Sequence, residues 1–293
     1  MYCQYIIVIF FITFGFILFE RNSMKKTYLC PKCRKALVSD GRSLRCEGGH
    51  VYDISAEGYV NLTQGISQGG DSKEMCRARR DFLAGDYYLP LAEELATVLS
   101  GIDAKAAVDM GCGEGYYDRV AVKHCPKLAV VGLDLSKETV RLASKAAKRE
   151  ALSDRLSYAV AGIFDTPLPD SAFDAAISVF APVADAECRR ILIENGCMIV
   201  VTPGELHLDG LKSAVYERPY TNIEKRKIYT GFEISDTIRV RGEIEVTGEN
   251  IKNLFLMTPY YWKTSEADSA KLGNLDRLET HIDFVVTVYK KTQ

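Results

Sequence analysis

The stretch Ala106–Tyr117, which reads AAVDMGCGEGYY, decides the fold. Three small or branched apolar residues lead into Asp109, and Gly111, Gly113 and Gly115 follow at alternate positions. A short buried strand that ends in a glycine-rich loop is how a doubly wound sheet brings its backbone against a nucleotide-like ligand. Glycine permits both the close approach and the unusual backbone angles of such a turn. The pattern predicts an α/β domain with a ligand at this loop.

The spacing of the glycines narrows the kind of ligand. The order is D-x-G-x-G-x-G, and neither the G-x-G-x-x-G of pyrophosphate sites nor the G-K-S/T of triphosphate sites is present here. A second apolar stretch, Ala129–Asp134, also closes on a carboxylate. In a βαβ unit, that spacing places Asp134 at the tip of the neighbouring strand, where it accepts both ribose hydroxyls. A nucleoside without phosphates is therefore expected near Asp109 and Asp134.

These two stretches together resemble the S-adenosylmethionine site of Rossmann-like methyltransferases. An NAD-type or purely structural βαβ unit is the alternative, because lone glycine motifs are weak evidence. From Tyr88 to Thr202, helical and strand-like segments alternate, which predicts a parallel sheet with helices on both faces. The closing alternation at His281–Tyr289 fits an added edge strand. We expect a Rossmann-like methyltransferase domain over residues 88–293.

Composition limits the class of protein. The 293 residues carry a net charge of −2 and are 47% hydrophobic, which is typical of a globular protein with one sizeable core and room for a small extra domain. Lys and Arg outnumber Asp and Glu between Met24 and Asp81, whereas the rest of the chain is acidic. The nine cysteines have uneven spacing, which fits reduced thiols in a cytoplasmic protein better than a secreted disulfide framework.

Residues 1–23 differ from the rest of the chain. Tyr5–Phe19 is an uncharged apolar run, shorter than the roughly 20 residues that a spanning helix needs. It has neither the positive start nor the small-residue end of a signal peptide. We expect a hydrophobic leader or mis-assigned upstream sequence, with translation starting at Met24 and no stable membrane association. A genuine membrane anchor is the alternative.

Residues 24–65 contain a metal-binding pattern. Cys30, Cys33, Cys46 and His50 are spaced C-x2-C-x12-C-x3-H. Two close pairs of soft or borderline ligands, each on a turn, are what tetrahedral zinc requires. Four protein ligands leave no open position for water, so the predicted zinc is structural. A segment this small depends on the metal for its fold.

Residues 66–87 are expected to form a linker and a basic helix. Ser72 is placed to cap that helix, which carries Arg77, Arg79 and Arg80. A basic helix after a zinc module is a reasonable contact for RNA phosphates. A solvated connecting helix explains the same charges equally well.

Further stretches complete a family pattern. They are AEGYVNL (56–62), GDSKEM (70–75), ARRDFL (78–83), GLDLSK (132–137), TPGELHL (202–208) and MTPYYW (257–262). Together with the zinc spacing and GCGEGYY (111–117), they resemble the RlmA-type 23S ribosomal RNA (guanine-N1)-methyltransferases over essentially all of residues 24–293. The resemblance implies methyl transfer from S-adenosylmethionine to N1 of a guanine in a 23S rRNA hairpin, and a homodimer whose two zinc modules shape an RNA cleft.

The resemblance also implies site residues. Zinc would be held by the four Cys and His positions given above, and S-adenosylmethionine would be contacted by Tyr88, Gly113, Glu114 and His207. The motifs themselves add Asp109, Gly111 and Asp134 to the cofactor site. Without the family match, His207 would be assigned to the surface.

Methyl transfer sets two demands on the protein. The nucleophile, methyl carbon and sulfur must be aligned, and guanine N1 must lose its proton to a general base. Asp185 and Glu187 follow an expected strand end closely and are candidate bases. The segment Val179–Pro182 contains neither the N-P-P-Y of many adenine- and cytosine-modifying enzymes nor a Pro-Cys nucleophile, which fits a different acceptor. Tyr260–Trp262 is expected either to stack on a base or to pack in the core.

Two rival functions remain at this stage. A small-molecule methyltransferase with a structural zinc module would be active on metabolites and would show no salt-sensitive RNA binding. A non-catalytic RNA-binding protein with a degenerate enzyme domain would not bind S-adenosylmethionine. The intact Asp109, glycine loop and Asp134 argue against the second.

Overall fold

The computed structural model describes residues 28–65, 72–224 and 227–292 of the chain. The leader expected at residues 1–23, the proposed start at Met24 and most of the expected linker lie outside the described residues. Among the helices that are described, none has the length and apolar character needed to cross a membrane.

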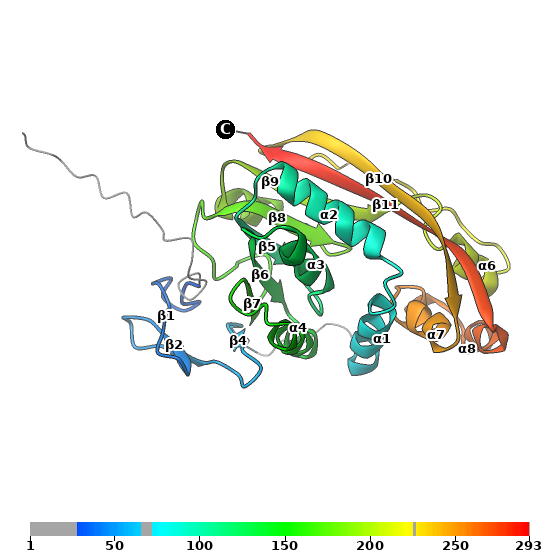
Figure 1. The fold of residues 1–293 in the computed structure, drawn as a ribbon, viewed down its shortest axis with the longest axis horizontal. Coiled ribbons are helices and arrows are strands. Elements are labelled where there is room, and N and C mark those ends of the chain that lie inside the picture. The colour runs from blue at the N-terminus through cyan, green and yellow to red at the C-terminus, as the bar shows by residue number, and fades with distance from the viewer. Residues whose placement is uncertain (1–27, 66–71, 225–226, 293) are drawn as a thin grey trace, which may run out of the picture.

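Within the described residues, eight strands form one sheet in the order β10-β11-β9-β8-β5-β6-β7-β4 (Figure 1). The strands from β9 to β4 run parallel, whereas β11 and β10 add an antiparallel pair beside β9. This arrangement confirms the parallel sheet and the closing edge strands predicted from the sequence. The strands are β4 (Val60–Asn61), β5 (Ala106–Met110), β6 (Ala129–Asp134), β7 (Leu156–Val160), β8 (Phe173–Val179), β9 (Leu192–Pro203), β10 (Phe232–Thr247) and β11 (Arg277–Lys291).

Both faces of the sheet are buried. Ala107 and Val130 lie in one apolar core, while their chain neighbours Val108 and Val131 lie in the other. Because side chains alternate along a strand, this division is the mark of a sheet covered on both sides. The helices are α1 (Lys73–Leu83), α2 (Leu89–Gly101), α3 (Tyr116–His124), α4 (Lys137–Arg149), α5 (Asp185–Ile191), α6 (Asp209–Val215), α7 (Glu249–Leu256) and α8 (Glu266–Ala270).

Two serines fix the starts of helices that the sequence predicts. Ser72 accepts a hydrogen bond from the Met75 N–H (3.2 Å), and Ser136 accepts one from the Thr139 N–H (3.4 Å). Each satisfies a backbone donor that has no partner within its own helix. The basic helix and the helix after β6 therefore begin where the sequence indicates.

The N-terminal zinc-pattern segment packs against the end of the sheet (Figure 1). It holds a small sheet of β1 (Val38–Ser39), β2 (Ser43–Arg45) and β3 (Val51–Asp53). Its last strand, β4, joins the large sheet, where Val60 is in register with Ala159 of β7. The Leu29 N–H also donates to the Pro167 carbonyl (2.8 Å). This segment is thus built into the sheet by backbone hydrogen bonds.

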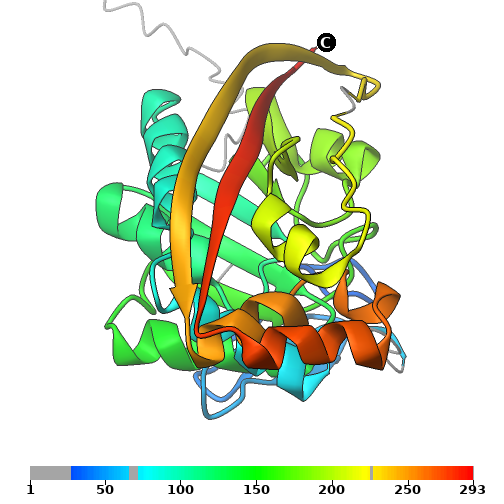
Figure 2. The same cartoon turned by 90° about the vertical axis from the view of Figure 1, so that its right-hand side faces the viewer.

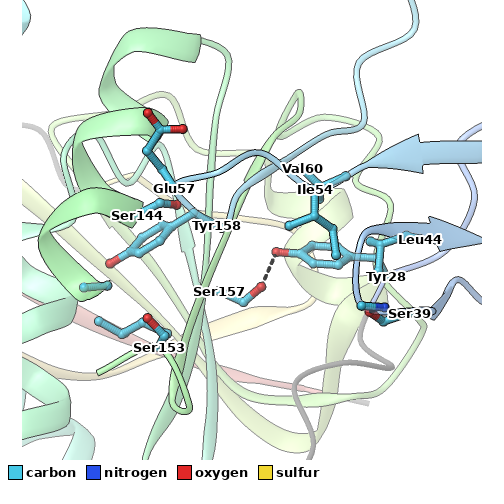
Figure 3. Close-up of a pocket in the computed structure, with 14 residues that line it drawn as sticks. Tyr28, Ser39, Leu44, Ile54, Glu57, Val60, Ser144, Ser153, Ser157 and Tyr158 are labelled. Atoms are coloured by element: carbon cyan, nitrogen blue, oxygen red, sulfur yellow. Dashed lines mark hydrogen bonds between the residues drawn. The ribbon is translucent and has the colours of Figure 1, made fainter. Parts of the chain in front are cut away.

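A cavity of about 250 Å³ lies between that segment and β7 (Figure 3). Two neighbouring β7 residues that line this cavity contact different parts of the protein. Ser157 hydrogen-bonds the Tyr28 hydroxyl (3.0 Å). The Tyr158 ring lies under the glycine loop, because a Cβ added at Gly132 or Gly115 would come within 2.5 Å of its atoms. Strand β7 therefore connects the N-terminal segment to the loop expected to bind the cofactor.

The hairpin of β10 and β11 runs along one side of the molecule, with α7 and α8 between its strands in the chain (Figure 2). Helix α7 packs against α1. The chain from Met257 to Lys263 follows α7 and includes the 3-10 turn η2 (Tyr261–Lys263). This insertion brings residues from late in the chain over the carboxyl ends of the parallel strands.

Candidate active site

A cavity of about 900 Å³ opens at the carboxyl ends of the parallel strands. Such ends are where open α/β sheets bind their ligands. Its walls come from the loops after β5, β6, β7, β8 and β9, from α1 and from the insertion after α7. Among the lining residues are Tyr88, Asp109, Gly111, Gly113, Glu114, Asp134 and His207, so the structure brings all the expected cofactor residues to one place.

The glycine loop has the geometry that its sequence requires. Gly111, Gly113 and Gly115 have φ values of +96°, +54° and +70°, which most side chains adopt only under strain. A Cβ at Gly111 would lie 2.7 Å from the Cβ of Ala181. The loop is anchored at Asp134, whose Oδ2 accepts the Gly113 N–H (3.0 Å). The loop therefore requires glycine both for its backbone angles and, at Gly111, for the close approach of Ala181.

Two acidic side chains at this loop are buried. Asp109 is 1% exposed and Glu114 is 4% exposed. Asp109 Oδ1 and Glu114 Oε1 have no hydrogen-bond partner among the described residues. Burial raises the pKa of both carboxyls. Buried acceptors of this kind call for a cationic or N–H donor, and the ammonium group of S-adenosylmethionine is such a donor. The residues present therefore fit this cofactor.

Tyr88 and His207 form a neutral hydrogen-bonded pair in the wall of the same cavity. His207 Nδ1 accepts the Asp283 N–H (3.3 Å), and Nε2 lies 3.3 Å from the Tyr88 hydroxyl. Burial lowers the pKa of His207 to about 3, so the ring is neutral. A neutral ring that accepts at Nδ1 carries its proton on Nε2 and donates to Tyr88. His207 is therefore a hydrogen-bond donor in this arrangement.

The four predicted zinc ligands converge. Their ligand atoms all lie within 4.8 Å of one another. The Sγ atoms of Cys33 and Cys46 are 3.6 Å apart, and His50 Nδ1 is 3.4 Å from the Sγ atoms of both Cys30 and Cys46. Ligands about 2.0–2.3 Å from a tetrahedral zinc ion are separated by roughly 3.5–3.8 Å. The donor set and its spacing both fit structural zinc.

Comparison with known proteins agrees with both sites. A methyltransferase-domain model matches residues 107–197, and a model described as the N-terminal region of RlmA, a zinc ribbon, matches residues 28–63. A 23S rRNA (guanine(748)-N(1))-methyltransferase of Streptomyces fradiae is 33% identical over 261 residues, covering 86% of this chain and 91% of the relative. The chain belongs to the 23S rRNA (guanine-N(1))-methyltransferase family. The methyltransferase match decides against an NAD-type βαβ unit.

A second relative and a solved structure also match. A putative 23S rRNA (guanine-N(1)-)-methyltransferase of Bacillus subtilis is 29% identical over 92% of this chain and 100% of its own length. Among solved structures, a geranyl diphosphate methyltransferase in complex with S-adenosylmethionine shares 18% identity, covering 77% of this chain and 93% of that chain with a TM-score of 0.47.

The two carboxylates expected to act as the base in this family member do not reach the cavity. Glu187 Oε1 accepts the Thr166 N–H (2.7 Å) and the Thr166 hydroxyl (2.6 Å), and Arg190 pairs with the same carboxylate. Although burial alone raises the pKa of Glu187, these hydrogen bonds lower it. Asp185 opens α5 and does not line the cavity either. Glu187 ties the loop after β7 to α5, and a role of either carboxylate as the base stays a prediction that this geometry does not favour.

The basic helix brings one of its three arginines to the cavity. Arg79 lines the wall, whereas Arg77 and Arg80 are exposed and Arg80 pairs with Asp81. The aromatic residues after α7 also differ in exposure. Tyr260 is buried, and Trp262 lines the cavity while being 70% exposed. Core packing is thus confirmed for Tyr260, whereas stacking of this stretch on a base stays a prediction.

Two functional neighbours escape the sequence motifs. Asp283, on β11, is fully buried and binds Arg239, and its backbone N–H orients His207. Although burial raises the pKa of Asp283, the hydrogen bonds from Arg239 lower it to about 2. Asp118, on α3, is 1% exposed and lies beside Asp109 and Tyr158. Only the fold brings Asp283 beside His207, whereas Asp118 lies nine residues after Asp109 but belongs to no motif.

Asp118→Asn is expected to stabilise the protein at neutral pH. Burial raises the pKa of Asp118 from 3.8 to about 6, so between those values the folded chain holds a proton that the unfolded chain has released. Stability is therefore lost as pH rises through this window. Asparagine does not ionise and avoids that loss. Urea unfolding should show a larger free energy of unfolding for the variant than for the wild type at pH 7.5, and equal values at pH 4. The same difference at both pH values would contradict the assignment.

Proposed function

We propose that this protein transfers a methyl group from S-adenosylmethionine to N1 of a guanine in a 23S rRNA hairpin, in the cytoplasm. The observation that carries the proposal is the pairing of a methyltransferase cavity with a zinc ribbon whose last strand is built into the same sheet. The relative from Streptomyces fradiae, which matches over 86% of the chain, supports the same reaction.

The cofactor would lie along the glycine loop. Asp134, at the end of β6, would accept the ribose hydroxyls, and one buried oxygen each of Asp109 and Glu114 would accept the ammonium group. Tyr88 and His207 close the far wall as a neutral hydrogen-bonded pair. When bound, the cofactor supplies an electrophilic methyl group on a sulfonium. The protein's task is to hold that group in line with the acceptor nitrogen.

The cavity has room for an acceptor base as well. Small-molecule sites measure roughly 300–1,000 Å³, and this cavity of about 900 Å³ is at the upper end. Guanine N1 lies on the Watson–Crick edge, so the base must be unpaired or flipped to reach the methyl group. A cofactor and one flipped nucleotide together account for a cavity of this size.

RNA would approach across the zinc ribbon and α1. Arg79 lines the cavity, and Arg77 and Arg80 extend the positive charge outward from it. Arg34, in the zinc ribbon, donates to the Thr166 carbonyl (2.8 Å) and so holds the ribbon against the cavity loop after β7. A homodimer would place two such ribbons around one RNA hairpin, and light scattering after size exclusion would measure that state.

Asp165 is the carboxylate best placed to take the N1 proton. It lines the cavity outside the glycine loop, and its side chain is 82% exposed. Asp165→Asn keeps the shape and is expected to lower kcat by about 100-fold, the lower end for a general base, with unchanged affinity for S-adenosylmethionine. Asp185→Asn serves as the matched control and should retain activity. A lower kcat in Asp185→Asn, with normal kcat in Asp165→Asn, would assign the general base to Asp185 instead.

Primer extension tests the function as a whole. Unmodified 23S rRNA that includes position 748 would be incubated with the protein, with and without S-adenosylmethionine. A methyl on guanine N1 blocks pairing, so reverse transcriptase is expected to stop one nucleotide short in the cofactor-dependent sample. With cofactor binding intact, absence of a stop would overturn the rRNA assignment and favour a small-molecule methyltransferase.

A further inference from the structure

Phe180 has a backbone conformation that is rare for a bulky residue. It directly follows β8 and has a φ of +54°. Among the aromatic residues that the structure describes, Phe180 alone has a positive φ. An L-residue with a large side chain adopts this region at a cost, and such strain concentrates at functional sites.

Neighbouring groups hold the strained turn in place. The Phe180 N–H donates to the Val201 carbonyl (3.2 Å), and the Ser178 hydroxyl donates to the Ala181 carbonyl (3.2 Å). On its other side the turn abuts the cofactor loop, since Ala181 leaves no space for a side chain at Gly111. The turn is therefore fixed directly against the loop that carries the methyl donor in the proposed function.

Core packing does not explain this arrangement. Phe180 is 45% exposed and lines the active-site cavity. Its ring lies near-parallel to His207 at 5.9 Å, with an interplanar angle of 24°, and tilted against Phe284 at 5.8 Å. A half-exposed apolar ring gains little from burial, so the backbone strain serves to aim the ring into the cavity.

We propose that the exposed face of Phe180 stacks on the acceptor guanine and positions N1 for methyl transfer. Stacking on aromatic rings is how proteins hold splayed RNA bases. The fixed turn orients the ring before RNA binds, and His207 and Phe284 support it from behind. This inference rests on the proposed function and adds the residue that holds the base.

Four variants distinguish the effect of removing the Phe180 ring from the effect of relieving its backbone strain. Phe180→Ala and Phe180→Gly both remove the ring, but glycine adopts a φ of +54° freely whereas alanine does not. Phe180→Tyr keeps a ring. Ile228→Ala removes an exposed apolar side chain that does not line the cavity. The readouts are KM for the rRNA substrate, kcat, thermal unfolding and calorimetric affinity for S-adenosylmethionine.

The expected pattern is specific. The alanine and glycine variants should lose kcat/KM alike by about 10- to 100-fold, the range for one stacked base, mainly through KM for RNA. Affinity for S-adenosylmethionine should stay unchanged, and the glycine variant should melt about 2 °C above the alanine variant because the strain is relieved. Phe180→Tyr should recover most of the RNA affinity, and Ile228→Ala should behave as wild type.

Three results would overturn the inference. They are wild-type KM in both ring-free variants, a fall in S-adenosylmethionine affinity in place of RNA affinity, and higher activity in the glycine variant than in the alanine variant. The last would mean that the shape of the turn matters and the ring does not. Failure of the proposed function looks different, because the wild-type protein itself would then give no primer-extension stop.

Discussion

Cys46→Ser is expected to unfold the zinc ribbon and to abolish methyl transfer, although Cys46 does not line the active-site cavity. Structural zinc contributes about 10–16 kcal/mol to the folding of small zinc peptides, and the ribbon's short strands have little else to hold them. Strand β4 would leave the sheet with the ribbon, and Arg34 would release the loop after β7. Zinc content measured with a chelating dye, protease cleavage within residues 28–63 and rRNA methylation would report the three losses.

Cys197→Ser provides the matched control. Cys197 is equally buried but lies on β9, outside the metal cluster. This variant should keep its zinc, its protease resistance and its activity. A Cys46→Ser protein that retained full methylation after losing zinc would show that the ribbon is dispensable for the reaction, contrary to the structural role argued here.

Asp134→Ala is expected to weaken S-adenosylmethionine binding by at least about 100-fold. The proposed pair of ribose hydrogen bonds to this carboxylate would each contribute about 1.5–3 kcal/mol, because the acceptor is charged. The same carboxylate accepts the Gly113 N–H (3.0 Å) and the Ser136 N–H (2.8 Å), so the glycine loop would also lose an anchor. Isothermal titration calorimetry measures the affinity directly.

Two comparisons make that result interpretable. Asp134→Asn keeps acceptor oxygen but loses charge, and it should fall between wild type and alanine. Asp154→Ala removes an exposed carboxylate outside the cavity and should bind the cofactor normally. Wild-type affinity in the Asp134→Ala protein would exclude this carboxylate as the ribose contact.

The parts of the site that the sequence predicts are those encoded within a few residues of one another. The glycine loop, Asp109 and the cysteine pairs each occupy a short motif whose spacing reflects local backbone geometry. Strand ends in a parallel sheet also meet at one edge, so Asp134 could be placed next to Asp109 without a structure. These predictions depend on the order of elements along the chain, and that order was predicted correctly.

The remaining parts depend on contacts between distant segments. Asp283 orients His207 from 76 residues away, through a hydrogen bond between antiparallel strand β11 and the loop after β9. Asp118 is an exception, because it lies in the first turn of α3 directly after the glycine loop, but a single acidic residue in a helix has no motif. Phe180 is marked by its backbone angle, which the letters V-F-A-P do not reveal.

The position of Asp185 and Glu187 away from the cavity has a related cause. Proximity to a strand end in the sequence suggested proximity to the acceptor. The chain instead turns at Ala181–Pro182 and runs into α5, where Glu187 pairs with Arg190 on the same helix and binds Thr166. A carboxylate three residues before an arginine on a helix is as well explained by that ion pair as by catalysis.

The parallel pairing of β4 with β7 has a consequence during synthesis. Val60 leaves the ribosome about 100 residues before Ala159, its partner in the sheet, which at roughly 5–20 residues per second is a delay of several seconds or more. Throughout that interval β4 lacks its partner in the large sheet, and Val60 has only its antiparallel bridge to Ile54 within the ribbon. Zinc can close the ribbon at once, because its four ligands lie within 21 consecutive positions from Cys30 to His50. Zinc binding would thus order the ribbon before the strand that completes the sheet emerges.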